Sequence, residues 1–96
     1  MEVDPAELKR AIESLHGGTA TFAQSVPVVE KYEGKTVWDG VVQVFDLTGN
    51  PQSTRAYAWS YELENGKRRI FSVLHTDKIN SPVAAVRAAI VAEHKR

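Results

Sequence analysis

The chain has 96 residues and a mass of 10.6 kDa, enough for one domain that buries roughly two-thirds of its unfolded surface. Hydrophobic residues make up 43% and charged residues 25%, which is close to the globular average and argues against disorder. No apolar run approaches the ~20 residues that cross a bilayer, and the opening residues do not resemble a signal peptide. We therefore expect one globular domain over residues 1–96, located in the cytoplasm, that is neither a membrane protein nor a secreted precursor.

The chain contains no cysteine, which excludes disulfides, cysteine-ligated zinc, iron–sulfur clusters and thiol catalysis, and is compatible with a reducing compartment. Twelve basic residues balance twelve acidic ones, so the strongly positive field of a dedicated nucleic-acid binder is missing. The charges are unevenly distributed, because residues 1–48 hold four basic and eight acidic residues and residues 49–96 hold the reverse. Such a bipolar chain can pair head to tail with a second copy or present one basic patch.

The first predicted element is a helix that begins near Pro5. Asp4 is a favoured cap residue, Pro5 suits the first helical position, and Glu7 completes a pattern like a capping box. Apolar residues recur at 8, 11, 12 and 15, which is one stripe of a helix. Gly17 and Gly18 are expected to end it, because glycine readily adopts the left-handed conformation at a helix C-terminus.

Two long strands are predicted next, over residues 21–32 and 36–47, with a turn at Glu33–Gly34. Pro27 lacks an amide donor, so its part of the first strand belongs at a sheet edge or an irregularity. The second strand has apolar residues at both parities. Either both of its faces are covered, or Asp39–Gly40 forms a bulge that shifts the parity, and we favour the bulge.

After a loop over residues 48–54, Asn65–Gly66 predicts a two-residue type I′ hairpin. This turn implies a register in which Glu64 faces Lys67, Glu62 faces Arg69 and Trp59 faces Ser72. One face of the hairpin then carries Tyr57, Trp59, Tyr61, Leu63, Ile70 and Leu74, and the other carries Ala56, Ala58, Ser60, Phe71, Val73 and His75. Both faces contain apolar side chains, so either face is eligible for the core.

The last predicted element is an alanine-rich helix that is capped by Ser81, starts at Pro82 and runs to about His94. Taken together, the elements predict an α+β fold in the order α-β-β-β-β-α. We expect a mainly antiparallel sheet of about four strands, with the N-terminal and C-terminal helices packed on one face.

This element order resembles the double-stranded-RNA-binding domain in outline. That family implies three strands and a lysine-rich start to its second helix, whereas this chain has four predicted strands and no lysine in residues 81–86. Without those lysines the helix is poorly equipped to hold phosphates, so the family's function is not carried across.

No catalytic, cofactor or metal motif stands out. His16, His75 and His94 lie at the ends of three different elements, and none has a neighbour at the spacing of metal ligands. Ser72, His75 and Asp77 are close in sequence, but Ser72 and His75 have opposite parity on a strand and are expected to point to opposite faces. We therefore predict no catalytic residues, no cofactor and no metal.

The candidate binding face is an aromatic stripe on one strand, formed by Tyr57, Trp59 and Tyr61. Arginines surround the stripe in the predicted hairpin, namely Arg55, Arg68 and Arg69. Sheets that display aromatic and arginine side chains stack the bases of single-stranded nucleic acids. Aromatic residues at period two are more often simply the buried face of a sheet, and that interpretation is favoured here.

The leading functional hypothesis is a non-catalytic protein-interaction or self-association module that uses a sheet face or an edge to bind an unknown protein or a second copy. The alternative is nucleic-acid binding through Tyr57, Trp59, Tyr61 and Arg68. A third hypothesis, an enzyme with His75 or Asp77 as proton carrier, has no motif to support it.

Overall fold

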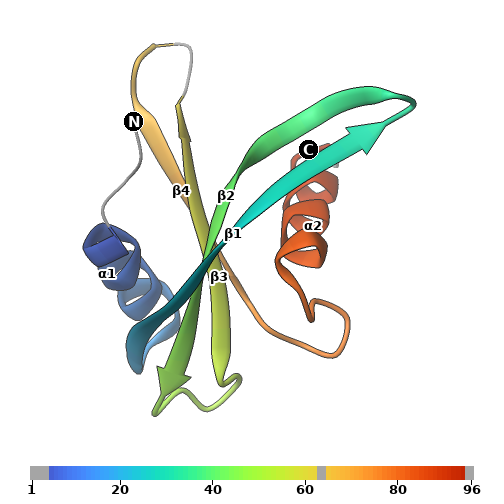
Figure 1. Cartoon of the computed structure of the whole chain (residues 1–96). Helices are drawn as coiled ribbons and strands as arrows, with labels where there is room; N and C mark the ends of the chain where they lie inside the picture. Colours follow the sequence, from blue (N-terminus) through green and yellow to red (C-terminus); the bar gives the residue numbers. More distant parts are fainter. Residues whose placement is uncertain (1–4, 63–64, 95–96) are drawn as a thin grey trace.

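The computed structural model describes residues 5–62 and 65–94 of the chain. Two helices and four strands follow one another as α1 (Pro5–His16), β1 (Thr19–Tyr32), β2 (Lys35–Thr48), β3 (Arg55–Glu62), β4 (Arg68–Leu74) and α2 (Pro82–His94). The strands form one antiparallel sheet in the order β1-β2-β3-β4 (Figure 1). The predicted α+β class and the element order α-β-β-β-β-α are confirmed.

The helix ends follow the local signals in the sequence. The Ser81 hydroxyl accepts a hydrogen bond from the backbone N–H of Ala84 at 3.1 Å, so the predicted cap of α2 is confirmed. Helix α1 begins at Pro5 as predicted, while its proposed cap Asp4 lies outside the described residues. Gly18, which follows α1, has a φ of +81°, and a methyl group there would lie 2.7 Å from the carbonyl oxygen of Thr48. Only glycine fits this turn without strain.

The first hairpin has the tight turn that the sequence predicts. Tyr32 pairs with Lys35, so Glu33 and Gly34 alone connect β1 to β2. Both residues have positive φ, 51° and 79°, as a type I′ turn requires. β1 is an outer strand of the sheet, which confirms the expected edge position of Pro27.

The predicted bulge at Asp39–Gly40 is wrong. Both residues pair in regular register with β1, and the irregularities lie where residues 23 and 37 interrupt the pairing. The apolar residues at both parities of β2 instead reflect a strand that is covered on both faces. Residues 42–45 are all buried in succession, which a strand with one wet face does not show.

The register of the second hairpin differs from the prediction by one residue. Trp59 pairs with Phe71 rather than Ser72, and Glu62 pairs with Arg68 rather than Arg69. Five residues, 63–67, therefore separate the last paired positions; the predicted pair of Glu64 with Lys67 lies partly outside the described residues. A shift of one residue exchanges the two faces of a strand.

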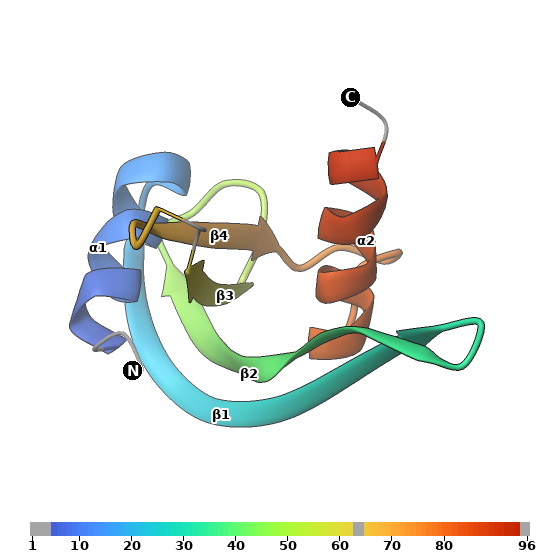
Figure 2. The ribbon, with the colours of Figure 1, turned by 90° about the horizontal axis from the view of Figure 1, so that it is seen from above.

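The two helices cover opposite faces of the sheet, which corrects the prediction that both pack on one face (Figure 2). In the first core, Leu8 and Ile12 of α1 pack on Ala20, Phe45, Leu47, Ala56, Ala58, Ile70 and Leu74. In the second core, Ala85 and Val86 of α2 pack on a surface that includes Val28, Val42, Val44, Tyr57, Trp59, Phe71 and Val73. Because the register places apolar side chains on both faces of β3 and β4, each face needs its own helix.

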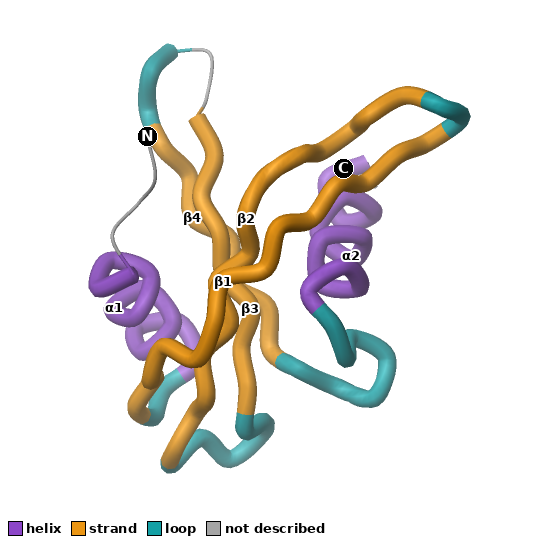
Figure 3. Tube along the Cα trace, in the orientation of Figure 1, coloured by secondary structure: helices purple, strands orange, loops and turns teal. Residues whose placement is uncertain are grey.

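The outer half of the β1–β2 hairpin extends beyond the other two strands (Figure 3). β2 pairs with β3 only through Gln43–Asp46, so residues 26–32 and 35–42 pair with each other alone. We call these residues the arm. Val26, Val28, Trp38 and Val42 of the arm belong to the second core with α2, and a two-stranded ribbon needs such packing to be stable.

Candidate interaction site

The structure places the aromatic stripe in the interior rather than on a surface. Tyr57 and Trp59 are 1% and 2% exposed, and α2 covers the face from which they project. Trp59 is packed between two other rings, with centroid distances of 6.0 Å to Trp38 and 5.6 Å to Phe71. The side chain of Tyr61 lies outside the described residues. In this arrangement neither Tyr57 nor Trp59 offers a ring face on which a base can stack.

The three arginines of the predicted face do not frame an exposed aromatic surface, because the rings beside Arg55 and Arg69 are packed in the second core. Arg55 is exposed, and its Nε lies 3.6 Å from a carboxylate oxygen of Asp46 on the neighbouring strand. The guanidinium carbon of Arg69 lies 5.2 Å from the centre of the Phe71 ring. Arg68 is half-buried at the start of β4, next to Arg69 and therefore on the other face of that strand.

Ser72 and His75, two of the polar residues considered for catalysis, have structural partners. Ser72 Oγ is hydrogen-bonded to His16 Nε2 at 3.0 Å, and the Tyr57 hydroxyl is hydrogen-bonded to His75 Nδ1 at 2.7 Å. Ser72 and His75 thus bind different partners. Burial raises the pKa of the Tyr57 phenol, an effect that nearby Arg55 partly offsets, so the phenol stays protonated at neutral pH. Asp77 is exposed, and the side chain of His94 lies outside the described residues.

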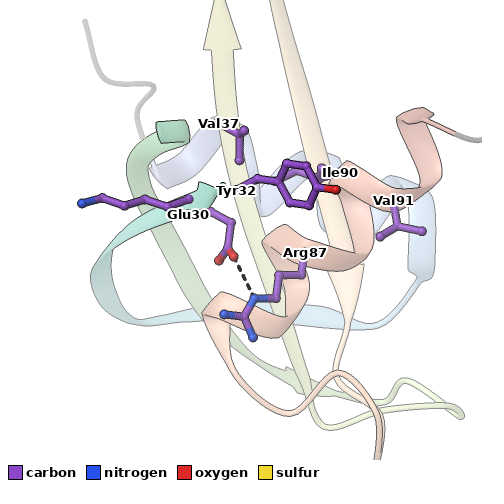
Figure 4. A pocket seen from close by; sticks show the side chains of 7 residues that line it. Glu30, Tyr32, Val37, Arg87, Ile90 and Val91 are labelled. Atoms are coloured by element: carbon purple, nitrogen blue, oxygen red, sulfur yellow. Dashed lines mark hydrogen bonds and ion pairs between the residues drawn. The ribbon is translucent and has the colours of Figure 1, made fainter. Parts of the chain in front are cut away.

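A hollow of about 530 Å³ lies between the arm and α2 (Figure 4). We call it the arm–helix groove, and it is lined by Glu30, Lys31, Tyr32 and Val37 of the arm and by Arg87, Ile90 and Val91 of α2. Tyr32, Val37 and Val91 are 68%, 47% and 52% exposed. Six large apolar side chains are exposed among the described residues, and these three of them line this one hollow.

One ion pair joins the two walls of the groove. Arg87 Nε donates a hydrogen bond to Glu30 Oε1 at 2.9 Å, across 57 positions of the sequence. The Arg87 side chain is 65% exposed and that of Glu30 only 13%. A pair this open to water adds at most about 1 kcal/mol to stability, so its main effect is to hold the arm and α2 in a defined relative position.

This groove was not predicted from the sequence, although α2 carries a signal for it. Arg87 is the single charged residue in residues 83–92. The apolar side chains of this segment are spread around the whole circumference of the helix instead of forming one stripe. A helix that packs on a sheet with one side is normally polar on the other, and an apolar circumference is typical of buried helices. The groove itself could not be read from spacing, because its walls are far apart in the sequence.

Neither a cluster of metal-ligating side chains nor a membrane-spanning helix is present among the described residues. They contain no group of three or more His, Cys, Asp or Glu side chains that could hold a metal ion. None of the described helices combines the length and the apolar character needed to span a bilayer. Comparisons of this chain with models of protein families, with curated proteins and with solved structures found no match.

Proposed function

We propose that this protein is a non-catalytic interaction module that binds an apolar surface of another protein chain in the arm–helix groove. The observation that carries the proposal is the clustering of exposed Tyr32, Val37 and Val91 around one hollow. Contiguous exposed apolar side chains with polar residues at their rim mark protein-binding surfaces. Here Glu30, Lys31 and Arg87 are the polar residues of the lining, and Lys31 and Arg87 are exposed.

The groove is a better candidate than the β1 edge of the sheet. Pro27 of the edge strand β1 has no N–H to donate, and the pairing with β2 is irregular at residue 23. Proline and irregular pairing are devices that protect an edge strand from adding a further strand. Binding through the groove needs no new backbone pairing.

The proposal includes a location in the cell and leaves out nucleic-acid binding. The absence of cysteine from the chain agrees with a reducing compartment, so the cytoplasm is its proposed location. Nucleic-acid binding by the aromatic stripe is not carried forward, because Tyr57 and Trp59 are buried and the net charge is zero.

The proposal is tested with a photo-crosslinking amino acid, p-benzoylphenylalanine, placed at position 91 in the native host. The control carries it at position 15, because Leu15 is exposed to a similar degree but lies on α1, away from the groove. We expect a protein adduct at position 91 that is lost when Val37→Ser is added. The captured chain is then identified by mass, and its binding to the purified protein should weaken at least tenfold with Val91→Asp.

Two results would contradict the proposal. One is the absence of any protein adduct at position 91. The other is an equal yield of adducts at positions 15 and 91, because an exposed apolar residue of either site would then capture chains by chance.

A further inference from the structure

We propose that Asn65 is a site of covalent modification, at which the side-chain amide is lost as ammonia and a new carboxylate forms in the loop between β3 and β4. The proposal does not depend on the arm–helix groove. It is carried by three observations: the Asn65–Gly66 pair, the place of this pair outside the β3–β4 ladder, and one hydrogen bond of the Asn65 side chain.

The reaction needs only the chain itself and water. The backbone nitrogen of Gly66 bonds to Cγ of Asn65, the Cγ–Nδ2 bond breaks, and the departing amide takes up the proton of the Gly66 N–H and leaves as ammonia. The product is a five-membered succinimide ring. One water molecule then opens the ring at one of its two carbonyl carbons. Opening at Cγ gives aspartate, and opening at the backbone carbon gives isoaspartate.

Gly66 makes the attack sterically possible. Because glycine has no Cβ, its backbone nitrogen can approach a neighbouring side chain more closely than that of any other residue. β3 ends at Glu62 and β4 begins at Arg68, so the Gly66 nitrogen is not held in the pairing of the two strands. Asn65 and Gly66 are both exposed, which gives water access to the ring that they form.

The Asn65 side chain is already folded back onto the backbone that must attack it. Its Oδ1 accepts a hydrogen bond from the backbone N–H of Lys67 at 3.0 Å, which is an Asx turn that spans Gly66. Attack at Cγ moves negative charge onto Oδ1, and an N–H directed at that oxygen stabilises the charge as the donors of an oxyanion hole do. The hydrogen bond uses the oxygen, which stays, and not the nitrogen, which must leave.

The other two asparagines of the chain are less suited to this reaction. Asn50 is followed by Pro51, whose nitrogen has no hydrogen to give up, and the Asn50 amide nitrogen donates to two backbone carbonyl oxygens. Asn80 is followed by Ser81, whose Cβ hinders the approach of its nitrogen and whose hydroxyl caps α2. Sequence and structure together therefore single out Asn65.

The modification changes the charge beside a basic segment. Carboxyl groups of this kind are ionised at neutral pH, so the formal net charge of the chain falls from zero to minus one. The new carboxylate is followed two residues later by Lys67, Arg68 and Arg69. Opening of the ring at the backbone carbon also adds one methylene group to the main chain, which lengthens the connection between β3 and β4.

The test is incubation of the purified full chain at mildly alkaline pH, with peptide mapping by mass spectrometry to follow each asparagine separately. We expect conversion at Asn65 at least tenfold faster than at Asn80, and no conversion at Asn50. Ion-exchange chromatography should show a growing species with one additional negative charge. Conversion at Asn65 that is absent, or no faster than at Asn80, overturns the proposal.

Two variants test the chemistry. Gly66→Ala should slow the conversion at least tenfold, and a Cβ at position 66 would meet no atom of the described residues within 4 Å beyond its chain neighbours. Because Gly66 has a φ of +82°, alanine is strained there, and circular dichroism shows whether this variant is folded. Asn65→Gln, which would have to close a six-membered ring, should remove the charged species and decides if Gly66→Ala unfolds. An unchanged rate of charge gain in the deciding variant overturns the proposal.

The contribution of the fold is tested by comparing the native chain with the chain unfolded in guanidinium chloride. Since the loop leaves Gly66 outside the ladder and directs the Lys67 N–H at Oδ1, the native rate at Asn65 should lie within tenfold of the unfolded rate or above it. A native rate more than tenfold below the unfolded rate would show that the fold protects Asn65, and would also overturn the proposal.

Discussion

Gly40 leaves the space that the ring of Trp38 occupies: a methyl group at position 40 would lie 2.8 Å from Cζ2 and 2.9 Å from Cη2 of Trp38. The same indole packs edge-on against Trp59, with ring centroids 6.0 Å apart and an interplanar angle of 65°. Because Gly40 has no side chain, Trp38 has the space to pack against Trp59 and so to join the arm to the second core.

Gly40→Ala should displace the Trp38 ring and loosen the arm. Because the added methyl group overpacks a rigid aromatic side chain, we expect the free energy of unfolding to fall by about 1–3 kcal/mol. Urea denaturation measures this change, and the tryptophan emission should shift to longer wavelength. Thr36→Ala, at an exposed residue of the same arm, is the matched control. An unfolding midpoint that does not move would show that Trp38 has room to shift.

Asn50 joins the end of α1 to the loop that follows β2. Its side-chain amide donates to the carbonyl oxygens of His16 and Gly17 at 2.8 and 3.3 Å, and its Oδ1 accepts from the backbone N–H groups of Gln52 and Ser53 at 2.8 and 3.0 Å. Asn50→Ala removes all four hydrogen bonds, so we expect a loss of about 1–3 kcal/mol in the free energy of unfolding.

Two further variants sharpen this prediction. Asn50→Asp keeps the acceptor but loses the donors and places a negative charge at the C-terminus of α1, so it should not restore stability. Gln52→Ala, at an exposed residue of the same loop, should change the unfolding free energy little. Equal stability of the wild type and Asn50→Ala in a thermal melt would contradict the proposed role of this side chain.

The burial of Trp59 can be measured directly. In a Trp38→Phe variant the emission reports Trp59 alone, and we expect a short-wavelength spectrum that iodide barely quenches, because Trp59 is 2% exposed. The reciprocal variant Trp59→Phe reports the half-buried Trp38 and should be quenched more. Strong quenching of Trp59 would show that the aromatic stripe is exposed to solvent, and base stacking would again be a candidate function.

Glu13 makes stability depend on pH. Its pKa lies below the ordinary value of 4.5, first because its carboxylate accepts a hydrogen bond from Lys9 and then because it accepts one from the backbone N–H of Ala20 at 2.9 Å. A carboxyl whose pKa is lowered on folding contributes stability above its unfolded pKa, and the contribution is lost as the pH falls through the folded pKa.

Glu13→Gln removes this contribution. We expect the variant to be less stable than the wild type at neutral pH and the difference to shrink as the pH falls below about 4.5. Thermal melts over a pH series measure it, with Asp39→Asn at an exposed residue of β2 as the control. If the difference in stability between the variant and the wild type stays constant down to acid pH, the loss comes from the geometry of the amide and not from the lost charge of the carboxylate.

The predictions that were confirmed rest on signals within a few residues. Ser81 followed by Pro82 marks the start of α2, and Gly34 marks the turn between β1 and β2 because glycine readily adopts positive φ. For the second hairpin the same kind of signal predicted the wrong register. Asn65–Gly66 is typical of a two-residue turn, but the observed pairing leaves five residues between the paired positions. Packing of Trp59 on Phe71 and of both rings under α2 outweighs the preference of one dipeptide.

The sequence by itself determined the class of the fold, the order of its elements and most of their ends, because caps, turns and periodicity act between near neighbours. Only the tertiary structure decided which side chains share a face. A slip of one residue between β3 and β4 moves Phe71 and Val73 to the side of Trp59. The two apolar faces of the sheet are then covered by different helices, α1 on one and α2 on the other. The arm–helix groove likewise exists only after folding, because it forms where Glu30 and Arg87, 57 positions apart, are brought together.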